Sequence, residues 1–161
     1  MAKADIELIA QSVLGTDLTQ EDCQVLSGIV KHKHLEKDEI LFDAETVDGN
    51  LYILVDGKLD ILKAIGPDKE LSINSLKTGA LIGELSFIDG DAHTMRLKAR
   101  HNSEVLVVHR DDFEQLSETH PKVVFNVMKS ILRFSHALQR RMLQENLEMQ
   151  RMVLNEYTAQ Y

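Results

Sequence analysis

The sequence predicts an α+β fold, in which an antiparallel β-roll, a jelly-roll-like double-stranded β-helix, lies between N-terminal helices and a long C-terminal helix. Three observations predict it. Apolar residues recur at helical spacing before residue 30 and at every second position from about residue 30 to 109. From Pro121 to Thr158 the chain contains no glycine and no further proline. We therefore expect short strands in the middle and one long helix, or two nearly continuous ones, at the end.

The N-terminal part is predicted to contain two helices separated by Gly15. In the first, apolar residues lie at helical spacing, namely Ile6, Leu8, Ile9 and Val13. Thr19 is followed three residues later by Asp22, a weak capping-box pattern that indicates the start of the second helix. Gly28 is expected near the end of that helix.

The central region alternates apolar and polar residues between turn signals, most of which are about ten residues apart. The turns are predicted at Asp48-Gly49-Asn50, Asp56-Gly57, Gly66-Pro67-Asp68, Thr78-Gly79 and Asp89-Gly90-Asp91. This spacing is typical of an antiparallel sandwich or roll, and it places residues 17–120 in one β-roll domain.

The C-terminal helix is expected to begin at Pro121, because proline suits a first helical turn while the residue before it is driven out of helical geometry. Its first turns carry apolar residues nearly all round, as expected where the helix packs on the roll: Val124, Phe125, Val127, Met128, Ile131, Leu132 and Phe134. A heptad pattern, the predicted seam, continues beyond them: Met128, Ile131, Ser135, Leu138, Met142, Glu145, Met149 and Met152. A helix of about 57 Å exceeds what the roll can cover, so we expect a homodimer.

Length and charge limit the function classes. A chain of 161 residues suits one domain with an appended element, here an N-terminal helical segment 1–16, the roll 17–120 and a dimerisation helix 121–161. The net charge of −8 makes direct binding to nucleic acid or an anionic membrane an unexpected role. The only cysteine, Cys23, cannot form an internal disulfide, and no apolar run is long enough to span a bilayer. These features predict a cytoplasmic protein.

The order of helices, strands and a Gly-Glu turn resembles the cyclic-nucleotide-binding domain family, found in catabolite-activator-type regulators, cyclic-nucleotide-dependent kinases and ion channels. Residues 51–61, LYILVDGKLDI, look like the family's central hairpin, and residues 78–88, TGALIGELSFI, look like the entry to its phosphate-binding cassette. The resemblance covers roughly residues 17–134. It implies a regulatory domain whose ligand is a cyclic nucleotide, cyclic AMP or cyclic GMP, with no other cofactor and no metal.

The first part of the cassette has the residues that the family pattern requires for the turn and for the ribose. Gly83 lets the backbone turn sharply, and the N–H groups that follow it can face an anion. The resemblance implies that Glu84 accepts a hydrogen bond from the ribose hydroxyl. The candidate ligand-binding residues are Ile82, Gly83, Glu84, Leu85, Ser86, His93, Thr94 and Arg96.

The second part of the cassette differs from the family pattern. Nine residues after Glu84, where the family has an arginine that pairs with the cyclic phosphate, this chain has His93. A histidine offers one donor in place of a charged fork, which predicts an affinity lower by about one to four orders of magnitude. Arg96 could replace the arginine if a bulge turned it inward, whereas regular alternation leaves it on the surface.

Two alternatives remain open. One is a degenerate family member that binds no nucleotide and serves as a dimeric scaffold or protein-interaction subunit. The other is a cupin-type metalloenzyme, because His32 and His34 share a strand face and Glu39 could join them. The glycines and the later histidine pattern of cupins are missing, and no nucleophile motif or P-loop occurs. The leading hypothesis is therefore a non-catalytic regulatory or sensor module that signals through its C-terminal helix to a regulated protein partner.

Overall fold

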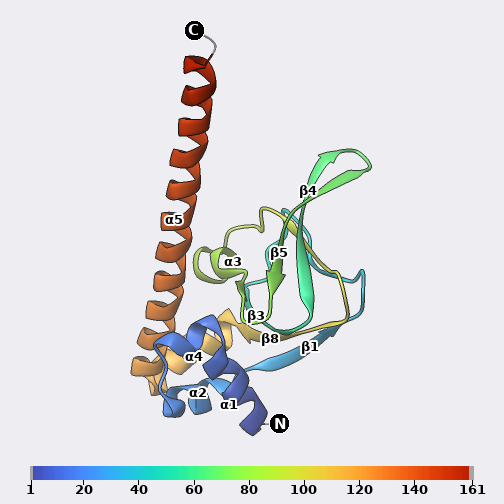
Figure 1. Ribbon diagram of the computed structural model, residues 1–161. Coiled ribbons are helices and arrows are strands. Elements are labelled where there is room, and N and C mark those ends of the chain that lie inside the picture. The colour runs from blue at the N-terminus through green and yellow to red at the C-terminus, as the bar shows by residue number, and fades with distance from the viewer. Residues whose placement is uncertain (1, 160–161) are drawn as a thin grey trace.

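The computed structural model describes residues 2–159, which form a β-roll with helices at both ends, as Figure 1 shows. Met1 and residues 160–161, at the two ends of the predicted organisation, lie outside the described residues. The helices are α1 (Ala2–Gln11), the 3-10 helix η1 (Val13–Thr16), α2 (Gln20–Ser27), α3 (Glu84–Asp89), α4 (Arg110–Thr119) and α5 (Pro121–Thr158). The strands are β1 (Lys31–Leu35), β2 (Ile40–Phe42), β3 (Asn50–Asp56), β4 (Lys58–Gly66), β5 (Lys69–Lys77), β6 (Leu81–Ile82), β7 (Arg96–Ala99) and β8 (Ser103–His109). The predicted fold class is confirmed.

The strands form two antiparallel four-stranded sheets, in the orders β1-β8-β3-β6 and β2-β7-β4-β5. Strand β3 is buried on both faces. Leu51 and Ile53 point toward a core shared with the helices, while Tyr52 and Leu54 point into a second core inside the roll. The alternation in this strand therefore separates two apolar faces, because both sides of the first sheet are covered.

Helix α2 begins and ends where the sequence predicts, whereas α1 ends at Gln11, and Val13 and Gly15 lie in the 3-10 helix η1. Thr19 and Asp22 form a complete capping box, in which the Asp22 N–H donates to Thr19 Oγ1 at 3.1 Å and the Thr19 N–H donates to Asp22 Oδ2 at 2.9 Å. Gly28 is the C-cap of α2. The Asn126 amide of α5 also donates to Asp22 Oδ2, at 2.9 Å, so the capping box attaches the base of the long helix to α2.

Helix α5 runs unbroken over 38 residues, as predicted for the segment after Pro121. Val123, Val127 and Ile131 are buried in the core shared by the helices and the first sheet. The expectation that the first turns are covered all round was wrong for Phe125 and Leu132, which are 64% and 55% exposed. The reason is geometric: η1, α2 and α4 pack against one side of the helix, and these two side chains lie on the other.

The C-terminal part of α5 projects away from the helices that hold its base (Figure 1). From Arg140 to Glu156 every residue is exposed. Neither α5 nor any other helix within residues 2–159 is apolar and long enough to cross a membrane.

Candidate functional site

The cassette consists of β6, Gly83, α3 and the loop that leads to β7. Gly83 has φ +81°, and a Cβ at this position would lie 2.8 Å from the Asn50 carbonyl oxygen and 3.3 Å from Tyr52 Cδ2. Only glycine accepts both the positive φ and the close approach to β3. The sharp turn that the sequence predicts at Gly83 is therefore held directly against the central strand.

The residues around this turn differ in what they can offer a ligand. Ile82 and Ser86 are buried, and Ser86 Oγ accepts a long hydrogen bond from the Gly49 N–H at 3.4 Å. Leu85 is 53% exposed. Glu84 is partly exposed, and its carboxylate forms no hydrogen bond or ion pair with any residue in the described range. Glu84 therefore offers a free carboxylate as a hydrogen-bond acceptor beside the turn.

His93, for which the resemblance predicts an arginine position, is buried, at 7% exposure. Its backbone is fixed by the loop after β2, because its N–H donates to the Thr46 carbonyl at 2.8 Å and its carbonyl accepts from the Glu45 N–H at 2.7 Å. Its ring stacks on Phe42, with centroids 3.6 Å apart and planes 12° apart. The imidazole is thus held in one place by its backbone bonds and by Phe42.

The Nε2 atom of His93 lies 3.1 Å from Asp48 Oδ1, but the approach is outside hydrogen-bond geometry. Among the residues that the structure describes, it is the single buried side-chain nitrogen or oxygen without a hydrogen bond. Asp48 is itself well bonded, since Oδ1 accepts from the Asn50 N–H at 3.0 Å and Oδ2 accepts from the Tyr52 hydroxyl at 2.6 Å. Burial and the bond to Asp48 hold the pKa of Tyr52 far above its ordinary value, so this phenol stays a neutral donor.

The last two candidate residues lie on the exposed side of the site. Thr94 is exposed, and Arg96 lies on the face of β7 opposite the buried Leu97. The Arg96 Nε donates to Asp43 Oδ1 at 2.5 Å, and its Nη1 contacts the Glu70 carboxylate. The structure therefore brings Gly83 and His93 together, with His93 Cε1 3.7 Å from where a Gly83 Cβ would be, while the charge of Arg96 is met by two carboxylates.

Arg110, the first residue of α4, connects the cassette to the C-terminal helices. Its Nε donates to the Phe87 carbonyl at 2.7 Å, its Nη2 donates to the Ser86 carbonyl, and its own N–H donates to the Gly49 carbonyl at 3.0 Å. The rings of Phe87 and Phe113 are in contact, with centroids 5.2 Å apart. The Arg110 guanidinium and the Phe87–Phe113 ring pair therefore join α3 directly to α4.

Sequence reasoning missed Asp48, Phe42 and Tyr52. It treated Asp48 only as part of a turn, because nothing in the local pattern shows that this turn folds over His93, which is distant in the chain. A usable signal was the spacing of Asp48 and Tyr52, since side chains four apart at the start of a strand can share one face.

His32, considered above as a metal ligand, is engaged elsewhere. Its Nε2 lies 2.5 Å from Asp5 Oδ1 of α1, and its Nδ1 lies 3.0 Å from Glu104 Oε1 of β8. Between residues 2 and 159 no group of three or more His, Cys, Asp or Glu side chains is placed to hold a metal ion. His32 instead attaches the N-terminal helix to the edge of the first sheet.

A ligand cassette built on a β-roll and followed by a long helix defines a class of ligand-responsive regulatory domains. The model of the cyclic nucleotide-binding domain family matches residues 32–120, and the chain belongs to this family. The structure of a cyclic nucleotide-binding domain from Methylobacillus flagellatus is similar, with a TM-score of 0.75 and 24% identity over 87% of this chain and 79% of that one.

Two curated relatives extend the comparison. The cAMP-activated global transcriptional regulator CRP of Salmonella typhimurium is 27% identical over 123 residues, which are 75% of this chain and 58% of that protein. The neuropathy target esterase sws of Drosophila virilis is 23% identical over 126 residues, 72% of this chain but 8% of that protein. The chain thus spans little more than half of one relative and a small part of the other.

Proposed function

We propose that this chain is a non-catalytic sensor module that binds a cyclic nucleotide in the cassette and passes the change to α5, through which two copies pair. The observation that carries the ligand site is the unbonded Nε2 of His93. A buried polar atom without a partner costs about 1–3 kcal/mol, and such atoms in native proteins call for a specific explanation. A phosphate oxygen at this nitrogen would supply the missing bond.

The two ends of the ligand fit different residues. The free carboxylate of Glu84 suits a ribose hydroxyl, which donates a hydrogen bond, and the exposed Leu85 offers an apolar contact beside it. His93 supplies one donor for the cyclic phosphate. The carboxylate of Asp48, 3.1 Å from that donor, repels an anion, so binding is expected to be weaker than with an arginine.

The signal would pass through the contacts that attach α3 to α4. A ligand that repositions α3 changes the contacts of Ser86 and Phe87 with Arg110 and of Phe87 with Phe113, and α4 leads directly into α5. Two arrangements of α4 and α5, of which the ligand stabilises one, would make the module a switch.

A second candidate function is a nucleotide-free dimeric scaffold or protein-interaction subunit. The position of Asp48 favours this second function. Its carboxylate already faces His93, so it can take the place of the negative charge that a bound phosphate would otherwise provide. In this case the His93 and Asp48 pair would be purely structural.

Calorimetric titration with cyclic AMP, cyclic GMP and cyclic di-GMP separates the two candidates. The sensor function predicts at least micromolar binding of one of them. Asp48→Asn keeps the shape and removes the negative charge, so it should tighten binding. Glu84→Ala should abolish it, while Glu118→Ala, an exposed carboxylate of α4, should not. If millimolar nucleotide produces no heat of binding and no shift in melting temperature, the sensor function is excluded and the scaffold function is supported.

A further inference from the structure

Helix α5 keeps a row of large apolar side chains on the side that faces away from the protein's core. Successive residues of a helix are about 100° apart round its axis, so residues spaced by four, seven or eleven stay on one side. Four residues with this spacing, which we call the outer row, are between 50% and 64% exposed: Phe125, Leu132, Leu143 and Leu147. Val127, about 160° round the helix from Phe125, is buried in the core. The outer row therefore remains exposed over about 33 Å of α5.

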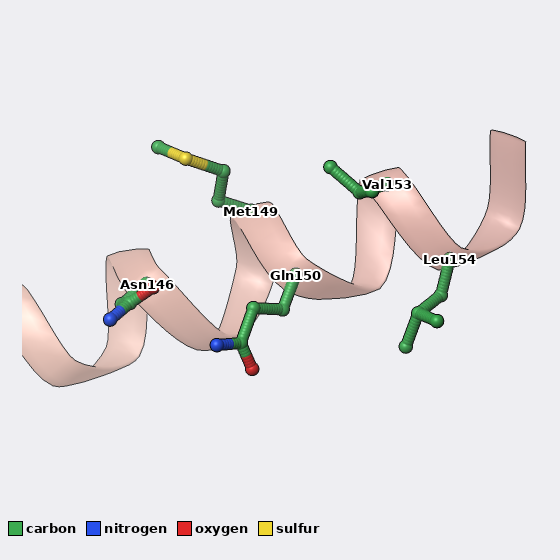
Figure 2. Close-up of a pocket in the computed structure, with 5 residues that line it drawn as sticks. All are labelled: Asn146, Met149, Gln150, Val153 and Leu154. Atoms are coloured by element: carbon green, nitrogen blue, oxygen red, sulfur yellow. The ribbon is translucent and has the colours of Figure 1, made fainter.

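The outer row lies on a different side of α5 from the predicted seam. Leu147 is about 160° round the helix from Met149 of that seam. Figure 2 shows the two sides near the end of the helix, where Met149 points one way and Gln150, three residues after Leu147, points the other. A groove between the two sides is lined by Asn146, Met149, Gln150, Val153 and Leu154. A pair of copies joined through the predicted seam would therefore leave the outer row open to another molecule.

Positive charge follows one edge of the outer row, where α5 carries Lys129, Arg133, Arg140 and Arg151. The first two share a single carboxylate oxygen, Asp17 Oδ1, at 3.5 and 3.4 Å. The other two, Arg140 and Arg151, are exposed and form no ion pair with any residue in the described range. This edge is thus a concentration of positive charge on a protein whose net charge is −8.

The carboxylates of α5 are placed elsewhere. Glu145 accepts a hydrogen bond from Arg141 Nε at 2.9 Å. Glu148 accepts one from the Gln144 amide at 3.3 Å. Glu156 lies on the opposite side of the helix from the outer row. A molecule that covers the outer row therefore meets cations whose opposite charge it must itself supply.

The form of the outer row suits a helical partner. An amphipathic helix that binds along a surface places apolar residues spaced by three, four and seven against it and keeps charged residues at its edges. Carboxylates at the edge of such a helix would lie beside the free arginines, and hydrogen bonds between arginine and carboxylate are stronger than those between neutral groups. The expected occupant is therefore a helix with an apolar stripe and an acidic edge.

This chain does not offer such a helix itself. Among the described helices other than α5, the large apolar residues that are exposed are Leu85 and Ile88 of α3. With six residues, α3 is about 9 Å long and covers less than a third of the outer row. The apolar residues of α4, Phe113 and Leu116, are buried. The occupant is therefore expected to come from a different protein.

The charge of the whole protein disfavours the other anionic partners. A net charge of −8 repels nucleic acid and anionic lipid over distances much longer than the edge of one helix. A nucleic acid would also leave the leucines of the outer row without an apolar contact. An acidic helix of modest net charge satisfies both the leucines and the arginines.

We propose that the outer row and its cationic edge bind an acidic amphipathic helix of a partner protein, with the partner's apolar residues on the outer row and its carboxylates at Arg140 and Arg151. The proposal goes beyond nucleotide sensing. It requires neither a bound nucleotide nor the pairing of two copies.

Two synthetic peptides of identical composition test the kind of partner. One has leucines at heptad spacing with glutamates beside them, and the other has the same residues in an order that forms no apolar stripe. Fluorescence anisotropy with the full chain should give a Kd below about 100 μM for the first peptide and roughly tenfold weaker binding for the second. Because the chain as a whole is acidic, net charge does not account for attraction of an acidic peptide. Equal affinities, or no binding of the first peptide, would overturn the proposal.

Two matched pairs of variants locate the contact on α5. Arg140→Glu and Arg141→Glu change the net charge equally, and the Kd should rise roughly fivefold or more for the first and stay within about twofold for the second. Leu147→Asn should raise the Kd roughly tenfold, whereas Val153→Asn, similarly exposed and about 120° round the helix, should not. Circular dichroism verifies that each variant keeps its helix content. Equal or reversed effects in either pair would overturn the assignment to the outer row.

Vesicles that contain phosphatidylserine and a duplex DNA test the other anionic partners. The natural chain should bind neither. Binding to either one that is lost in Arg140→Glu would assign the cationic edge to lipid or nucleic acid and overturn the helical partner. Nucleotide titration and the oligomeric state report on the proposed function separately, so failure of one proposal is distinguishable from failure of the other.

Discussion

The Nε atom of Arg110 donates a hydrogen bond to the carbonyl of Phe87 at 2.7 Å, and this bond joins the last turn of α3 to the first residue of α4. The same guanidinium also contacts the Ser86 carbonyl. A short helix of six residues has little stability of its own, so its position depends on such tertiary contacts. The cassette is therefore held in place from the side of the C-terminal helices.

Replacement of Arg110 by alanine should loosen α3 more than it weakens the whole fold. The loss of hydrogen bonds from a charged donor should lower the free energy of unfolding by about 1.5–3 kcal/mol. Hydrogen exchange should accelerate most at the Phe87 and Gly90 amides, which donate to the Gly83 and Ser86 carbonyls. Arg151→Ala, an exposed site on α5, is the control. Equal protection of these amides in both variants would contradict the role of Arg110.

Gly83→Ala should disrupt the cassette. Its Cβ would approach the Asn50 carbonyl to 2.8 Å in a backbone with φ +81°, so the turn must shift away from β3. We expect a loss of about 1–3 kcal/mol in unfolding free energy. Gly66→Ala is a matched control, since no atom lies within 4 Å of a Cβ there and its φ is not positive. Chemical denaturation measures both variants. If both lower the unfolding free energy by a similar small amount, the close approach of Gly83 to the Asn50 carbonyl does not restrict this position in solution.

The contact of His32 with two carboxylates predicts a pH-dependent attachment of α1. The bonds to Glu104 and Asp5 raise the pKa of His32 above its ordinary value of 6.5. Because the folded pKa is higher than the unfolded one, the stabilisation is fully present below about pH 6.5 and is lost as the pH rises through the folded pKa. His32→Asn should remove this part of the pH profile of the unfolding free energy. His136→Asn, an exposed site on α5, should retain it, and identical profiles of the natural chain and His32→Asn would refute the attachment.

Asn126→Ala should weaken the joint between α5 and α2. Burial raises the pKa of Asp22, but the bonds from the Thr19 backbone and from Asn126 outweigh it, so the pKa is lowered overall. Removal of the Asn126 amide leaves the buried carboxylate of Asp22 with one hydrogen-bond donor fewer. The free energy of unfolding should fall by about 1–3 kcal/mol. Thermal unfolding measures the effect, with the exposed Gln115→Ala of α4 as the control. Equal melting temperatures for the two variants would count against this joint.

Much of the fold follows from local patterns. The capping box at Thr19, the end of α2 at Gly28, the alternation of β3 and the start of α5 at Pro121 each depend on a few neighbouring residues, and all of them appear in the structure. The Gly-Glu turn of the cassette could also be placed, because only glycine suits its backbone. Such features are readable because the physics that determines them acts within one or two turns of the chain.

The site was only partly predictable. His93 was singled out because the resemblance predicts an arginine at its position, and that assignment stays a prediction. Its stacking on Phe42 and its approach to Asp48 arise between segments far apart in the chain. The same is true of Arg110, whose bonds to α3 depend on where α4 begins relative to the roll. None of these contacts has a spacing in the sequence that would reveal it.

The sequence was sufficient to predict α5 as one long helix with a heptad pattern, because helical periodicity and the absence of glycine and proline are local properties. Which side of that helix is free depends on how it packs on the other elements. Val123, Val127 and Ile131 are buried in the core, and Phe125 and Leu132 are left outside. The sequence does not distinguish an apolar side chain of α5 that is buried from one that is exposed, because burial depends on which other elements pack against that side of the helix.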